Sequence, residues 1–236
     1  MNRNSVAQVL AEFLGTAVLV MIALILGQTT AVSYFIATSM AAAAAVVYLL
    51  FNMVSGAHTN PAVTFGMWTA RQIGTLKGIA YIAAQLLGGI ASWQLFQYLT
   101  DHTLTAKSTS FSTPVFVAEL IGTLVVAMAF AAALNKKVDS TYSGLMVGAA
   151  YFVGIIIAAT ASAGYINPAI AIGSRAWSAA YVLGPLVGGL IGVNLYHFFF
   201  NGENSYAGAF TSKKSTSSKG VVVKRTTVRK KKTTKK

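Results

Sequence analysis

Two Asn-Pro-Ala triplets, at 60–62 and 167–169, are the residues whose types and spacing point most clearly to a chemical role. Asn is a favoured N-cap and Pro is favoured at the first helical position, so each triplet predicts the start of a helix. The side-chain oxygen of a capping Asn accepts a bond from its own helix, which leaves the NH₂ group free to donate. We therefore expect Asn60 and Asn167 to be paired hydrogen-bond donors at one site.

Both triplets belong to a tandem repeat. The segment AEFLGT starts at residue 11 and AELIGT at residue 118, while SGAHTNPA starts at 55 and SAGYINPA at 162. Both pairs are offset by 107 positions, and a common offset without a gap indicates an internal duplication. A third pair, YIAAQLLGG from 81 and YVLGPLVGG from 181, is offset by 100. We assign residues 1–106 to the first repeat and 107–200 to the second.

The composition is that of a membrane protein. Of 236 residues, 55% are hydrophobic and only 10% are charged, whereas a soluble domain has about a quarter charged residues. A membrane-spanning helix needs about 20 apolar residues. Six blocks are long enough, which argues against a soluble helical protein, and with no cysteine there is neither a disulfide nor a Cys-ligated metal. The six predicted spans are 6–27, 34–54, 78–99, 114–134, 142–161 and 178–200.

The two helices that begin at the triplets are too short to cross a membrane. We predict them at 60–70 and 167–177, each about 16 Å long at about 1.5 Å per residue, against a hydrocarbon layer of about 30 Å. Because each repeat has three spans, the second enters the membrane from the opposite side, as an inverted repeat. The two half-helices then meet N-terminus to N-terminus. Their positive ends and the two Asn donors are expected to repel cations and to orient a water so that protons do not pass.

Positive charge is concentrated at the C-terminal end. The net charge is +13, and residues 201–236 hold eleven Lys and Arg against Glu203. Such a segment does not fold alone, so we expect a disordered tail that associates with anionic lipid; nucleic-acid binding is a weaker alternative. The positive-inside rule places both termini in the cytoplasm. The basic residues on the same side are Arg3, Arg71, Lys77, Lys136 and Lys137.

The segments SGAHTNPAVTFG and GYINPAIAIG, preceded by AEFLGT and AELIGT, resemble the aquaporin (major intrinsic protein) family over residues 6–200. The resemblance implies an all-α membrane fold of six transmembrane helices and two re-entrant half-helices. It also implies a homotetramer in the lipid bilayer with one pore per subunit, passing water and small neutral solutes. We expect no enzyme activity, cofactor or metal, because no nucleophile–base pair, metal-ligand cluster or phosphate-binding loop is recognisable.

Buried polar residues are expected to support the pore loops. Glu12 and Glu119 occupy matching repeat positions within predicted spans, where carboxylates are costly and usually have a function. The resemblance implies that they support the backbone of the two re-entrant loops; a proton-relay role is the less favoured alternative. His58 either lines the pore entrance or is a structural imidazole.

The expected selectivity filter lacks its usual arginine. Family members have Asn-Pro-Ala-Arg in the second motif, and Ile170 stands at the arginine position here. The resemblance places Met40, Ile155 and Gly164 at the other filter positions, so we expect an uncharged filter. Arg175 lies five residues beyond Ile170 and is turned away from it.

The solute class stays open. Ala171 replaces the Asp that is usual in glycerol channels, whereas Tyr181-Val182 is a mixed signal. We expect a water channel that also passes small neutral solutes. The alternatives are a facilitator of glycerol, urea or hydrogen peroxide, and a poorly conducting structural or adhesion protein on the same fold. The basic tail and missing arginine also resemble plant small basic intrinsic proteins, although their first motif is usually altered.

Overall fold

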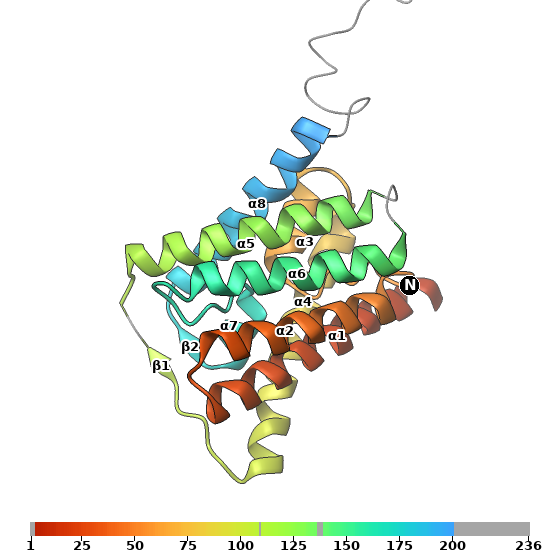
Figure 1. Ribbon diagram of the computed structural model, residues 1–236. Coiled ribbons are helices and arrows are strands. Elements are labelled where there is room, and N and C mark those ends of the chain that lie inside the picture. Colours follow the sequence, from red (N-terminus) through yellow and green to blue (C-terminus); the bar gives the residue numbers. More distant parts are fainter. Residues whose placement is uncertain (1–2, 109, 136–138, 201–236) are drawn as a thin grey trace, which may run out of the picture.

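The computed structural model describes residues 3–108, 110–135 and 139–200, which form a helical bundle (Figure 1). Six of its helices are long and apolar enough to cross a membrane, as the sequence predicts. The basic tail and the pair Lys136–Lys137 lie outside the described residues. The helices are α1 (Arg3–Thr29), α2 (Ser33–Phe51), α3 (Pro61–Thr69), α4 (Thr75–Thr100), α5 (Thr113–Leu134), α6 (Ser140–Ala158), α7 (Pro168–Gly173) and α8 (Ala180–Phe200).

The two short helices begin where the triplets predict. Asn60 and Asn167 are in extended conformation, and each side-chain oxygen accepts a 2.9 Å bond from the backbone N–H two residues on. Pro61 and Pro168 then take the first helical position. The caps therefore form as expected for an N-terminal Asn-Pro pair.

The second short helix is shorter than predicted. We expected a helix over 167–177, but α7 ends at Gly173. Arg175 has a positive φ of 56°, which no helix continues through. The chain then enters β2 (Ala176–Trp177), which pairs in parallel with β1 (Lys107–Ser108). The Lys107 N–H donates to the Arg175 carbonyl at 2.8 Å, so a distant loop holds the chain just beyond the end of the helix.

The long helices pack in pairs that follow the repeat. Helix α1 packs on α4 in the first repeat, and α5 packs on α8 in the second. Helices α2 and α6 contact each other across the two repeats, and Figure 1 shows α6 lying between α5 and α2. Each short helix contacts the last helix of the other repeat, α3 on α8 and α7 on α4. The two repeats therefore hold each other's short helices in place.

Glycines make these crossed contacts possible. A Cβ added at Gly89 on α4 would lie 2.7 Å from the Ala169 carbonyl oxygen, closer than real Cβ atoms come to oxygen. A Cβ at Gly189 on α8 would collide with the Ala62 carbonyl. Small residues let helix backbones approach closely, so the Gly-Gly pairs of both repeats seat the short helices deep in the bundle.

Candidate functional site

The two Asn side chains meet at the centre of the bundle and hold each other's loop. The Asn60 Nδ2 donates to the Ile166 carbonyl at 2.9 Å, and the Asn167 Nδ2 donates to the Thr59 carbonyl at 3.0 Å. Both side chains are fully buried. Because an amide NH₂ has two hydrogens, one N–H of each Asn stays available to a further acceptor. We expected the whole NH₂ group to be available, so the donor capacity of the pair is half the prediction.

The residues before each Asn have an unusual backbone. Thr59 and Ile166 both have φ of 45°, a left-handed conformation that is rare for β-branched residues. Backbone strain of this kind persists only where surrounding contacts hold it. It turns the two carbonyl groups toward the opposite Asn, so the strain and the crossed bonds belong to one arrangement.

In the first loop, hydrogen bonds to Glu12 stabilise the strained backbone at Thr59. Its Oε1 accepts from Ser55 Oγ at 2.6 Å and the His58 N–H at 3.0 Å, and its Oε2 accepts from the Thr59 N–H at 2.6 Å and Gln85 Nε2 at 2.7 Å. Four donors surround a carboxylate with four acceptor sites. These bonds are consistent with the proposal that Glu12 supports the loop, the role that the family resemblance implies.

Glu119 repeats the arrangement in the second loop. It accepts from Ser162 Oγ at 2.7 Å and from the backbone N–H groups of Tyr165 at 3.0 Å and Ile166 at 2.5 Å. The structure gives it no counterpart of the Gln85 bond, because Pro185 stands at the matching position of α8. Both carboxylates are fully buried, so each loop is anchored from within the bundle.

His58 belongs to the same buried network. Its Nδ1 lies 3.2 Å from Thr64 Oγ1, and its ring packs edge-on against Tyr81 with centroids 5.5 Å apart. Thr64 is bonded in turn to Gln85. Only 2% of His58 is exposed, so of the two roles considered for it the structure favours a structural imidazole.

One cavity of about 600 Å³ brings the four expected filter residues together. It opens at the end of the bundle that carries the α1–α2 and α4–α5 connections, where Ser33 and His102 line it. Met40, Ile155, Gly164 and Ile170 all contribute to its wall. Gly164 has φ of 68°, and an added Cβ would lie 3.3 Å from Ile155, so glycine suits both the turn and the space. We name this space the entry cavity.

Arg175 does not line the entry cavity. Its Nη1 donates to the Leu104 carbonyl at 2.9 Å, and its guanidinium lies 4.3 Å from the Trp93 ring centroid. The first contact holds the guanidinium at the α4–α5 connection, and the second packs it against α4. Arg175 therefore does not take the place of the arginine missing at Ile170.

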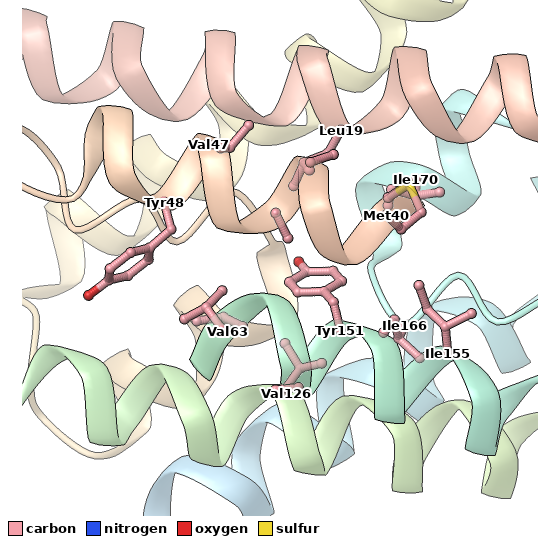
Figure 2. Close-up of a cluster of buried hydrophobic side chains, with 14 of the residues drawn as sticks. Leu19, Met40, Val47, Tyr48, Val63, Val126, Tyr151, Ile155, Ile166 and Ile170 are labelled. Atoms are coloured by element: carbon pink, nitrogen blue, oxygen red, sulfur yellow. The ribbon is translucent and has the colours of Figure 1, made fainter. Parts of the chain in front are cut away.

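Tyr151 is the residue of this region that the sequence did not single out. Figure 2 shows its ring between the filter residues Met40, Ile155 and Ile170 on one side and Val63 on the other. Its side chain is fully buried. The sequence could have indicated Tyr151, because it lies four residues before Ile155 and therefore one turn away on the same face of α6.

Metal chemistry has no visible site here. Within the described parts of the chain, no three His, Asp or Glu side chains come together in a group that could hold a metal ion. What the arrangement provides instead is a polar centre of two amides, beside a cavity whose wall at Met40, Ile155, Gly164 and Ile170 carries no charged side chain.

Comparison with known proteins agrees with this geometry. The family model described as major intrinsic protein matches residues 2–196. Aquaporin TIP1-1 of Arabidopsis thaliana is 34% identical over 161 residues, covering 62% of this chain and 64% of that protein. A probable TIP-type aquaporin of Medicago truncatula is 33% identical over 159 residues, with the same coverages. The matched part thus spans about 64% of the length of these relatives.

Two more distant matches extend the comparison. The Drosophila melanogaster neurogenic protein big brain is 29% identical over 220 residues, covering 86% of this chain and 31% of that protein. The X-ray structure of the aquaglyceroporin from Plasmodium falciparum superposes with a TM-score of 0.67 at 24% identity, covering 81% of this chain and 95% of that one. At that identity the likeness concerns the fold alone. Taken with the family model, which spans both Asn-Pro-Ala triplets, five apolar helices and most of the sixth, these findings mean that the chain belongs to the major intrinsic protein family.

Proposed function

We propose that this protein is a passive transmembrane channel for water that also passes small neutral solutes. The observation that carries the proposal is the pairing of Asn60 and Asn167 at the centre of the bundle, each with one N–H still able to donate. A water oxygen between the two amides accepts from both and points its hydrogens away. The wall of the entry cavity includes Ile170, three residues beyond Asn167 in the chain.

Proton exclusion follows from the same two donors. Protons move along a chain of waters only if each water can reverse its hydrogen bonds. A water held by two fixed N–H donors does not reverse, and the N-terminal ends of α3 and α7 disfavour a positive charge nearby. We therefore propose that the Asn pair excludes protons and other cations.

With an uncharged filter, we expect the protein to discriminate only weakly among small neutral solutes at the four filter residues. Ile170 replaces a charged donor, and none of Met40, Ile155 and Gly164 has a polar side chain. A polar solute loses water contacts there without gaining a charged partner, at a cost of about 1–3 kcal/mol on protein-derived scales. Water is small enough to keep its water neighbours in a cavity of this size.

Several features of the assembly remain proposals. We propose a homotetramer in which each subunit has its own pore, with both termini in the cytoplasm and the basic tail associating with anionic lipid. Under that orientation the entry cavity faces the non-cytoplasmic side. Large apolar side chains such as Leu50, Leu76 and Leu145 are exposed on the long helices, as expected for contacts with lipid or neighbouring subunits.

Reconstitution tests the proposed function. The full-length chain in liposomes should raise osmotic water permeability above that of empty liposomes, measured by stopped-flow light scattering. Glycerol and urea gradients give the solute permeabilities in the same vesicles. Water permeability equal to that of empty liposomes, with insertion demonstrated, would reject the channel and favour a structural or adhesion role on the same fold.

A further inference from the structure

Tyr151 has a buried hydroxyl group that lacks a hydrogen bond. The side chain is fully buried, and within the described residues its hydroxyl oxygen has no hydrogen-bond partner. Buried tyrosine hydroxyls are normally bonded, and an unpaired one calls for a physical reason. A permeating molecule that bonds to this group as it passes would be such a reason.

The hydroxyl lies beside the two amides of the pore centre. It is close enough to the side chains of both Asn60 and Asn167 to interact with them, although neither contact has the geometry of a hydrogen bond. Each amide has one N–H already bonded to the opposite loop. One phenol and two amide N–H groups therefore meet with unfilled bonding capacity.

The ring lies on the route between the entry cavity and the far side of the bundle. The wall of the cavity includes all four filter residues but neither Asn60 nor Asn167, both of which are fully buried. In Figure 2 the Tyr151 ring occupies the space between Ile170 and Val63. These two are the residues that follow the Asn-Pro-Ala triplets of the two repeats. The ring thus stands at the midpoint of the inverted repeat.

The inverted repeat itself does not require an aromatic ring here. At the offset of 107, the counterpart of Tyr151 is Ala44 on α2, which is also buried. The second repeat therefore has a large aromatic side chain at this position, where the first repeat has only the methyl group of Ala44. The obstruction is a feature of α6 alone, so one substitution removes it.

We propose that Tyr151, and not the Met40–Ile155–Gly164–Ile170 filter, is the narrowest barrier of the pore and determines which neutral molecules cross. The ring limits size, so molecules that enter the cavity are sorted at the Asn pair. The hydroxyl and the two free N–H groups supply three partners for a single water, which suits a site needing two to four polar partners. Glycerol is larger than water, so we expect the ring to slow glycerol more than water.

This inference rests on the proposed channel function and is tested by comparing variants with the wild type. Tyr151→Ala removes the ring. We expect glycerol permeability to rise by about tenfold, because even a small reduction of the free-energy barrier gives a tenfold change in rate. Water permeability should rise severalfold. Tyr151→Phe keeps the ring and removes the hydroxyl. We expect it to lower water permeability while glycerol permeability stays at the wild-type level.

Two controls separate the ring from general loosening of the bundle. Phe130→Ala truncates another buried aromatic residue, on α5, which packs against Tyr48 at 5.8 Å between ring centroids. Tyr81→Phe removes a buried hydroxyl that donates to the Ser55 carbonyl at 2.9 Å. Neither should raise the ratio of glycerol to water permeability. If Tyr151→Ala inserts poorly, Tyr151→Val fills more of the space and should show the same direction of change.

The outcomes distinguish this inference from the proposed function. A conducting wild type with the same water and glycerol permeabilities in Tyr151→Ala and Tyr151→Val overturns the inference and leaves the channel intact. A wild type at the level of empty liposomes with a conducting Tyr151→Ala supports the inference and overturns conduction by the native chain. If neither conducts, both are overturned.

Discussion

Asn60 and Asn167 stabilise each other's loop through reciprocal bonds. Asn60 donates to the carbonyl of the residue before Asn167, at 2.9 Å, and Asn167 donates to the carbonyl of the residue before Asn60, at 3.0 Å. Each side chain also caps its own short helix. One amide therefore joins a helix start of one repeat to a loop of the other, and a change at either Asn should affect both halves of the proposed pore.

The Asn167→Asp substitution should damage this pairing and alter ion exclusion. A carboxylate oxygen would stand about 3.0 Å from the Thr59 carbonyl oxygen, where the amide N–H now donates. The added negative charge at two helix N-termini favours cations. We expect lower water permeability and a measurable cation conductance in planar bilayers.

Asn52→Asp is the control for a charge and a lost amide donor away from the Asn pair, because the Asn52 amide donates to the Tyr48 and Leu49 carbonyls at the end of α2. It should leave both measurements at wild-type values. Folded Asn167→Asp protein with unchanged permeability and conductance would show that the amide pair is not the pore centre.

Glu12→Gln should destabilise the first loop. All four acceptor sites of Glu12 bond to donors. In the Glu12→Gln variant one of the two oxygens is replaced by an NH₂ group, so the two donors that bonded to that oxygen lose their acceptor. Each buried group left unsatisfied costs about 1–3 kcal/mol. We expect a lower thermal unfolding temperature in detergent and a reduced water permeability.

The exposed carboxylate Asp139 provides the comparison for Glu12. It caps α6 by accepting from the Thr141 N–H at 2.8 Å, and Asn caps helices about as well as Asp. Asp139→Asn should therefore unfold at the wild-type temperature. Equal unfolding temperatures for Glu12→Gln and Asp139→Asn would contradict the support role.

Gly189→Ala should push the first short helix out of place. An added Cβ collides with the Ala62 carbonyl, and overpacking of this kind costs about 1–3 kcal/mol. We expect a lower unfolding temperature and lower permeability. Gly27→Ala is the matched control for the unfolding temperature, because a Cβ at Gly27 meets nothing within 4 Å; the same unfolding temperature in both variants would refute the close α3–α8 contact.

Ile170→Arg restores the charge that the filter lacks. The guanidinium would narrow the floor of the entry cavity and supply donors, so glycerol and urea permeability should fall more than water permeability. The effect should be larger in a Tyr151→Ala background, where the ring no longer sorts solutes. Permeability ratios that Ile170→Arg leaves unchanged in both backgrounds would show that Ile170 does not line the path.

The sequence predicted the fold well because its signals were local. Apolar blocks predicted the six long helices, and the Asn-Pro pairs predicted the starts of α3 and α7. The predicted end of α7 was wrong, because the chain takes a left-handed turn at Arg175 and then pairs with Lys107, a contact across distant parts of the chain. Local sequence contains no sign of such a contact.

The centre of the pore was harder to predict. The offset of 107 matched Asn60 to Asn167, but it could not tell that each amide donates to the opposite loop. Tyr151 lies in a helix that is apolar all round, so periodicity does not distinguish the face toward the pore from the faces toward other helices. Three-dimensional packing was needed to place its ring beside the amides.

The central claim is tested most directly by comparing the osmotic water permeability of the wild type with that of Ile170→Trp. Both proteins are reconstituted in liposomes with equal amounts of inserted protein. The indole would fill the floor of the entry cavity, which has a volume of about 600 Å³. If water crosses through this cavity and the Asn pair, the wild type should exceed empty liposomes and Ile170→Trp should fall to their level. Equal permeability of the two proteins, with both folded and inserted, would show that water does not take this route.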